Sequence, residues 1–241
     1  MNWYKYASPA AFYPLAGKMV PWFAIPAAIL FALGLYIGFF VAPTDFQQGD
    51  AYRIMFIHVP AAWMGMFLYV LMAFYAGIGW AFNARLSSMM ASSLAITGAL
   101  FTLLSLVTGS LWGKPTWGTW WVWDARMTST LILLFLYVGF ISLQAAIDDP
   151  RRADRAGAVL AIVGVINVPI IYFSVQWWNT LHQGATIRIL NKPTVAPPML
   201  AAMLILLAAC WLYSVAVVLI RLRCIILERE QNAVWLAEGA A

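Results

Sequence analysis

Charged residues are scarce in this sequence. They make up only 10% of its 241 residues, whereas 64% are hydrophobic, and the mean hydropathy is +0.83. Soluble domains carry about 25% charged residues, so this composition excludes an ordinary soluble protein. The net charge of +5 comes from residues outside the long hydrophobic runs. It therefore indicates membrane topology and gives no sign of a nucleic-acid partner.

Acidic residues are absent from every long hydrophobic run. All nine lie between or beyond these runs, from Asp45 to Glu238. Ion-coupled pumps and carriers usually keep a carboxylate at membrane depth. The distribution therefore argues against a proton or cation transporter.

Sequence motifs for several kinds of chemistry are also missing. Cys210 and Cys224 form no Cys-x-x-Cys or Cys-x-x-Cys-His motif, which excludes thiol exchange and covalent c-type haem attachment by that motif. There is no phosphate-binding loop and no recognisable nucleophile–base pair. We therefore do not expect an enzyme, and we expect any ATPase activity to reside in a partner subunit.

Six hydrophobic runs reach or nearly reach the ~20 residues that a helix needs to cross a membrane. We expect an all-α polytopic membrane protein in which residues 1–241 form one six-helix domain in the lipid bilayer. Nine Lys and Arg residues fall on one side of these runs and five on the other, which favours cytoplasmic termini. The expected spans are residues 22–41, 55–82, 89–111, 128–147, 156–173 and 199–220.

Tryptophan is concentrated in the second outer loop, residues 112–127. Five tryptophans lie within twelve residues there: Trp112, Trp117, Trp120, Trp121 and Trp123. Gly113, Pro115 and Gly118 are expected to break the preceding helix. Helical spacing of Trp117, Trp120, Trp121 and Asp124 predicts a short interfacial helix with three rings on one face and Trp123 on another. The alternative is an aromatic belt, although a belt spreads its rings over several helix ends.

The only two histidines, His58 and His182, fall in the first and third outer loops. Pro60 at a first-turn position places His58 just ahead of the second span, and Trp178 shares a face with His182 if that segment is helical. Taken singly, each histidine is interpreted as an ordinary polar residue at a helix end. Together they resemble a ligand pair. Neutral histidine is a common axial ligand of haem iron, whereas a zinc site would need further help from Asp124.

A porphyrin fits this combination of residues, because it is a flat apolar plate with two carboxylates. Tryptophan rings can pack on the plate, and the two histidines can bind its iron. The outer cations available for the propionates are Arg126, Lys114, Arg188 and Lys192. Each of them can instead be a solvated loop charge, and Arg126 can pair with Asp124. For Asp124 we favour a structural role in which it orders the loop by accepting hydrogen bonds.

Three stretches resemble a known family. "WGTWWVWDARMTS" is similar to the tryptophan-rich WWD signature of the haem-handling proteins of cytochrome c biogenesis. The flanking "QGDAYRIMFIHVPAAW" and "NVPIIYFSVQWWNTLHQG" resemble the CcmC family specifically. The similarity covers at least Gln47 to Gly184. Met127 stands where leucine is expected, which is a volume-conserving change.

The resemblance implies a haem-binding and transfer protein of the bacterial inner membrane. Such proteins present haem b, which is iron protoporphyrin IX held non-covalently, on the periplasmic side. They hand it to the haem chaperone CcmE and work beside CcmA, CcmB and CcmD. The family's axial ligands correspond to His58 and His182. Its haem platform and chaperone docking area correspond to residues Trp117 to Arg126, which include Trp120, Trp121, Trp123 and Asp124.

Three other functions remain open from the residues alone. The spans could conduct haem as the membrane subunit of an ABC transporter, through the hydroxyl-rich third span and a fifth span that Pro169 could kink. The aromatic loop could dock a protein without any cofactor. An electron-transfer cytochrome is disfavoured, because a relay across the membrane needs histidines at depth.

Overall fold

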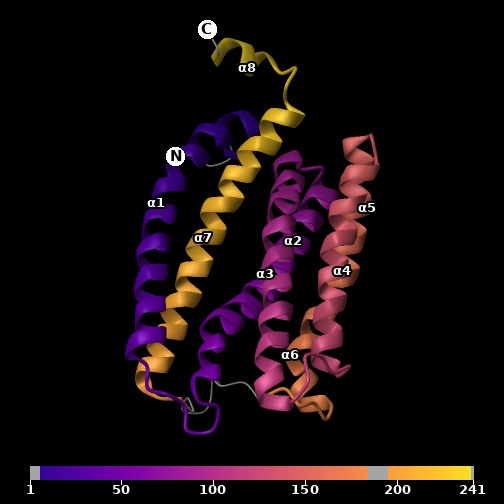
Figure 1. Ribbon diagram of the computed structural model, residues 1–241. Helices are drawn as coiled ribbons and strands as arrows, with labels where there is room; N and C mark the ends of the chain where they lie inside the picture. The colour runs from indigo at the N-terminus through magenta and orange to yellow at the C-terminus, as the bar shows by residue number, and fades with distance from the viewer. Residues whose placement is uncertain (1–5, 184–194, 240–241) are drawn as a thin grey trace.

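The computed structural model describes residues 6–183 and 195–239, and within them it contains helices and no strand. Six helices, one of them broken in the middle, are long and apolar enough to cross a membrane. The predicted all-α class and number of spans are therefore confirmed. Helices α1 and α7 lie together on one side of the molecule, α4, α5 and α6 on the other, and α2 and α3 between them (Figure 1).

The first span begins well before the expected residue. Helix α1 runs over Pro9–Tyr36 and continues into the π-helical turn η2, Ile37–Val41. Its start is fixed by Ser8, whose hydroxyl accepts a hydrogen bond from the backbone N–H of Ala11. Pro9 lies in the first helical turn, where a proline loses no hydrogen bond. The expected start at Trp22 was too late, because the residues before it contain Pro9, Pro14, Pro21 and Lys18 and so resemble a span less than those that follow.

The second span occupies the expected residues. Helix α2 runs over Met55–Phe82 and follows a short 3-10 helix, η3, Asp50–Ile54. His58 is therefore inside the first turn of α2 and not ahead of it, which corrects the expectation drawn from Pro60. A proline this close to a helix start removes only one backbone bond, so the helix can begin upstream of it.

The tryptophan-rich loop contains no helix of its own, so the prediction of a short interfacial helix there is wrong. Helix α3 runs over Arg85–Trp117 and passes through Pro115. It ends at Gly118, whose φ of +79° is left-handed and suits glycine. Residues 118–124 are bends and irregular chain, and helix α4, Ala125–Ala146, begins directly after Asp124. The regular spacing of the tryptophans therefore does not correspond to a helical face.

The fifth span consists of two helices, α5, Pro150–Gly164, and α6, Asn167–Trp177. The break at residues 165–166 lies one turn before Pro169, where the proline ring removes the bond to residue 165 and crowds its carbonyl. The expected kink is therefore present as a break. Helix α7, Pro197–Arg229, and the short α8, Val234–Gly239, complete the chain.

The core lies mainly between α2, α3 and α4, where close helix contacts depend on small residues. Gly98 of α3 packs directly against the Tyr137 ring of α4, so closely that a Cβ atom there would overlap the hydroxyl. Tyr137 in turn donates a hydrogen bond to the Gly65 carbonyl of α2 at 2.8 Å. Glycine thus allows close helix packing of the kind found in membrane interiors.

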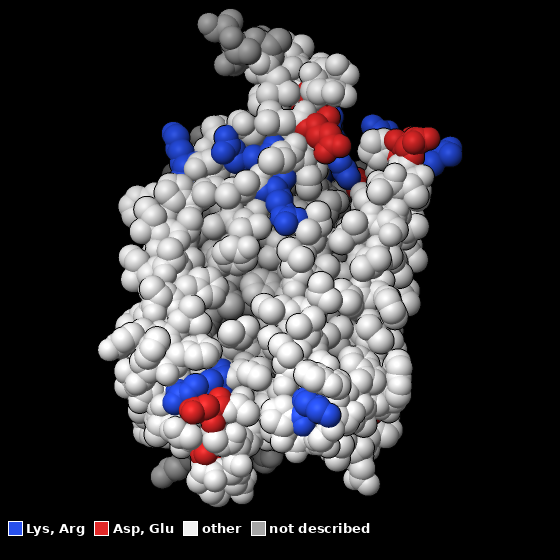
Figure 2. Space-filling view, viewed as in Figure 1, with Lys and Arg blue, Asp and Glu red and all other residues white. Residues whose placement is uncertain are grey.

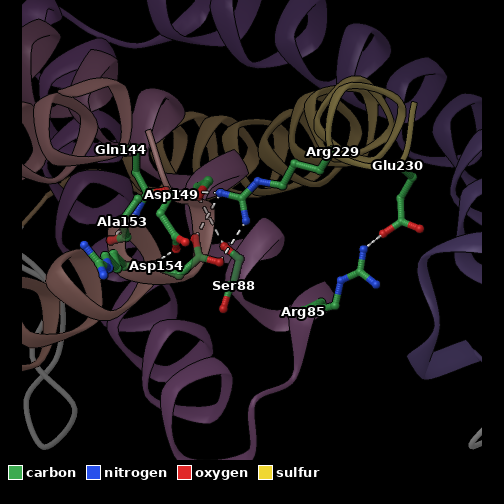
Figure 3. A network of polar contacts seen from close by, with 10 residues as sticks. Arg85, Ser88, Gln144, Asp149, Ala153, Asp154, Arg229 and Glu230 are labelled. Atoms are coloured by element: carbon green, nitrogen blue, oxygen red, sulfur yellow. Dashed lines mark hydrogen bonds and ion pairs between the residues drawn. The ribbon is translucent and has the colours of Figure 1, made fainter. Parts of the chain in front are cut away.

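Charged side chains lie at the two ends of the bundle and leave an uncharged band between them (Figure 2). Lys and Arg gather at the end where α1 begins and α7 ends, here called the terminal end. There Arg229 of α7 donates to both carboxylate oxygens of Asp154 of α5, at 2.8 and 2.9 Å, and to Gln144 of α4 (Figure 3). Arg85 pairs with Glu230 nearby. At the terminal end, these contacts join α3, α4 and α5 to the last residues of α7.

Candidate haem site

The two histidines converge at the opposite end of the bundle, here called the site end. His58 comes from the first turn of α2, and His182 from the chain that follows α6. Their ring centres are 6.2 Å apart, although 123 residues separate them in the sequence. The structure therefore brings together the two side chains that were expected to form a ligand pair.

His58 is buried, with 8% of its surface exposed, and its orientation is set by helix α3. Its Nδ1 atom lies 3.1 Å from Thr108 Oγ1. The Thr108 hydroxyl donates its own hydrogen to the Leu104 carbonyl at 2.6 Å. It is therefore an acceptor toward the imidazole, which assigns the hydrogen of His58 to Nδ1 and leaves the Nε2 lone pair free.

Two further residues of α3, Gly109 and Trp112, lie against the His58 ring. A Cβ atom on Gly109 would lie 3.0 Å from its Cε1 atom, so only glycine leaves room for the imidazole without displacement. Trp112 packs edge-on against the ring with centres 5.8 Å apart. The Trp112 indole N–H donates to Gln48 at 2.7 Å and so ties α3 to the chain before η3.

His182 is held by more local contacts. Helix α6 ends at Trp177, and Trp178 is extended, so the segment is not helical and the condition for Trp178 and His182 to share a helical face is not met. Asn179 and Thr180 follow, and such side chains compete for backbone hydrogen bonds. The Nδ1 atom of His182 lies 2.8 Å from the Gln183 carbonyl. A carbonyl can only accept, so Nδ1 carries the hydrogen and Nε2 is again free.

Burial and charge favour the neutral form of His182. Its pKa is lowered from the usual 6.5, first by loss of solvent contact and then by the positive charge of Arg126. The ring of Trp117 lies 6.2 Å from it, centre to centre. A neutral imidazole with a free Nε2 atom is the form that binds metal.

A cavity of about 150 Å³ lies between these residues. Its buried part is formed by Ser105, Leu106, Met127, Leu133 and Met203, and its exposed part by Trp63, Tyr172, Gln176 and Gln183. Most of these walls are apolar. The cavity therefore suits a mainly hydrophobic ligand that reaches the protein surface at the site end.

Among the residues that the structure describes, Arg126 is the cation that lines this cavity. Its guanidinium donates to the Ile171 carbonyl of α6 at 2.6 Å, and it takes part in none of the ion pairs found in residues 6–183 and 195–239. The alternative pairing with Asp124 is therefore not observed. Lys114 instead bonds to the Gly118 carbonyl and lies over Trp120. Arg188 and Lys192 lie outside the described residues.

The structure divides the predicted tryptophan platform. Trp117 lines the cavity, but Trp120, Trp121 and Trp123 do not. Trp121 packs against Trp123, which is 75% exposed, with ring centres 5.3 Å apart. Asp124 caps helix α4 by accepting the Met127 N–H at 2.8 Å, in line with the structural role that we favoured.

Sequence reasoning left several cavity residues out of the candidate site. Trp112 stood in the same tryptophan-rich stretch, and Trp63 in the same "FIHVPAAW" stretch as His58, so both could have been found from their nearness in sequence to the candidate residues. Thr108 had no such signal, because it contacts His58 across 50 residues of sequence.

Comparisons with known proteins agree on one family. The family model described as "Heme exporter protein C" matches residues 2–237. The chain is 45% identical to "Heme exporter protein C" of Escherichia coli (strain K12), over 98% of this chain and 95% of that protein. It is 44% identical to the protein of the same name from Bradyrhizobium diazoefficiens, over 97% and 89%.

A mitochondrial relative is also similar. The "Putative cytochrome c biosynthesis ccmC-like mitochondrial protein" of Marchantia polymorpha is 48% identical over 66% of this chain and 67% of that protein. With the match over nearly the full length to the bacterial relatives, the chain belongs to the CcmC family, whose members handle haem in cytochrome c maturation.

Proposed function

We propose that this protein binds haem b at the site end through His58 and His182 and hands it to the chaperone CcmE on the periplasmic side of the inner membrane. The observation that carries the proposal is the pair of imidazoles, each with Nδ1 held by a hydrogen bond and with no hydrogen bond to Nε2 from residues 6–183 and 195–239. Ligating histidines usually have this arrangement.

The number of donors supports haem over a bare metal ion. No group of three or more His, Cys, Asp and Glu side chains converges within the described ranges, whereas a structural zinc ion takes four ligands. Haem iron already has four porphyrin nitrogens and needs at most two axial ligands from the protein. Two histidines are sufficient for it.

The spacing of the two rings also fits. A metal–imidazole bond is ~2 Å long and a ring nitrogen lies about 1 Å from its ring centre, so one metal ion between two imidazoles separates their centres by about 6 Å. The observed separation is 6.2 Å. The cavity itself is smaller than the ~300–1,000 Å³ of most ligand pockets, so haem-sized cargo requires its exposed walls to move apart.

Arg126 supplies the charge that a haem propionate needs. It faces the cavity and has no carboxylate partner among the ion pairs of the described chain. Trp117 and Trp63 supply aromatic walls. Arginine pairs strongly with carboxylates, and aromatic rings pack well on a porphyrin.

The distribution of charge supports the proposed orientation. Lys and Arg gather at the terminal end, which the positive-inside rule places in the cytoplasm. The site end then faces the periplasm, and the exposed Trp120 and Trp123 are available to CcmE. CcmA, CcmB and CcmD are the proposed partners in a membrane complex, and ATP hydrolysis belongs to one of them.

The test is the absorption spectrum of the purified full chain after haem loading. Wild type should show a six-coordinate low-spin spectrum, and His58→Ala and His182→Ala should each lose it. A variant at the terminal end, Arg155→Ala, is the matched control and should keep it. Haem binding that neither histidine affects would refute the ligand assignment, and no binding by wild type would favour a cofactor-free docking subunit.

A further inference from the structure

The two histidines are held in unequal ways. His58 is inside helix α2, is buried, and bonds through Nδ1 to a residue of a different helix. His182 lies beyond the end of α6, is half-buried, and bonds through Nδ1 to the carbonyl of the adjacent residue. The orientation of His58 thus depends on two packed helices, and that of His182 on local backbone.

Thr108 is the residue through which α3 fixes His58. Helices α2 and α3 pack along their lengths, and Thr108 is itself buried. Its hydroxyl donates to Leu104 and accepts from His58, so both partners of the hydroxyl are fixed in direction. Gly109 next to it leaves just enough room for the imidazole.

We propose that Thr108 positions His58 as the axial ligand that is retained longest, and that His182 is the ligand exchanged first when haem leaves. The inference rests on the proposed haem-transfer function and adds an order of events to it. Neither the family match nor the pairing of the histidines implies such an order.

The exchange is a simple ligand substitution. The bond between iron and His182 Nε2 breaks, and a nitrogen or oxygen donor of the acceptor protein forms a bond at the same coordination position. His58 Nε2 stays bound until that donor is in place. The departing imidazole leaves with its lone pair and the incoming donor supplies its own, so no proton or electron is transferred in this step.

The exposure of the cavity walls supports the same order. His182 is next to the exposed Gln183, and Gln176 of α6 is also exposed at that part of the cavity. On the His58 side, Thr108 and the adjoining Ser105 are buried. An incoming donor therefore reaches the His182 position from outside more directly than the His58 position.

The first experiment measures access to each coordination position with imidazole as the probe. Full-length His182→Ala and His58→Ala are loaded with haem in detergent and titrated with imidazole. We expect His182→Ala to regain a six-coordinate spectrum at an imidazole concentration at least tenfold lower than His58→Ala. Equal concentrations, or the reverse order, would overturn the proposed sequence.

The second experiment tests Thr108 by the rate of haem loss to a haem-free globin. Thr108→Val should raise this rate by about 10–100-fold, which is the usual cost of removing the partner of a metal-binding histidine. Thr108→Ser keeps a hydroxyl and should restore most of the wild-type rate. Thr97→Val makes the same change at another buried position of α3, away from the cavity, and is the matched control.

A double-mutant comparison separates positioning from general destabilisation. If Thr108 acts through His58, Thr108→Val should add nothing to the rate of haem loss in the His58→Ala background and its full effect in the His182→Ala background. An equal effect in both backgrounds would overturn the positioning role. Wild-type protein that binds no haem would instead refute the proposed function itself, so the two failures are distinct.

Discussion

Tyr69 and Tyr137 meet edge to face in the core with ring centres 4.9 Å apart, yet only the Tyr137 hydroxyl has a hydrogen-bond partner within the described chain. Tyr137→Phe removes a buried bond to the Gly65 carbonyl and should lower the free energy of unfolding by about 0.5–1.5 kcal/mol. Tyr69→Phe removes an unpaired buried hydroxyl and should be neutral or stabilising. Thermal unfolding in detergent compares the two, and equal losses would contradict the assignment.

Gly109→Ala should weaken haem binding. The new methyl group would lie 3.0 Å from His58 Cε1 and push the ring away from the direction that Thr108 sets. We expect about a tenfold loss of affinity in a haem titration, similar to other losses of histidine orientation. Gly77→Ala is the control, because its nearest neighbour would be an ordinary 3.6 Å contact. If both variants bind haem as wild type does, Gly109 is not needed for the ring position.

Haem binding should tolerate mild acid in wild type and less so in Arg126→Gln. The pKa of His182 is lowered from 6.5 by burial and by Arg126, so the imidazole stays neutral and able to bind iron as the pH falls through 6.5. Removing the Arg126 charge removes one of these causes and raises the pKa. Loss of the six-coordinate spectrum should then begin at a higher pH. If wild type and Arg126→Gln lose the six-coordinate spectrum at the same pH, Arg126 has no influence on His182.

Arg229→Ala should destabilise the bundle without changing the haem site. The variant loses two bonds to Asp154 and one to Gln144, all partly buried, and we expect a loss of about 1–3 kcal/mol. Arg155→Ala, an exposed change on the same helix as Asp154, should stay within about 0.5 kcal/mol. The haem spectrum of both should match wild type, since these contacts lie at the terminal end. A spectral change in Arg229→Ala would reveal coupling between the two ends.

Hydrophobic runs predicted the spans because a membrane-spanning helix must be apolar. The exact helix ends depend instead on flanking polar residues and on where prolines are tolerated. Helix α2 was placed correctly because polar chain bounds its apolar run on both sides. Helix α1 extends to Pro9, because prolines near a helix start and at membrane depth are tolerated when the lost bonds are few. Composition alone does not distinguish such prolines from helix breakers.

The histidine pair was predictable because the sequence offers only two histidines on one side of the membrane. The tryptophan arrangement was not, because residues 118–124 are irregular and helical spacing has no meaning there. The part played by Thr108 depends on the packing of α2 against α3. No local pattern encodes that contact.

The pairing of α1 with α7 has a consequence for how the protein is made. Helix α1 packs chiefly against α7, the last span of the chain, and most of its surface is exposed in the finished bundle. Ribosomes deliver the N-terminal span first. Helix α1 must therefore reside in the bilayer without its partner while the 155 residues between Val41 and Pro197 are synthesised, and its strongly apolar composition allows it to do so.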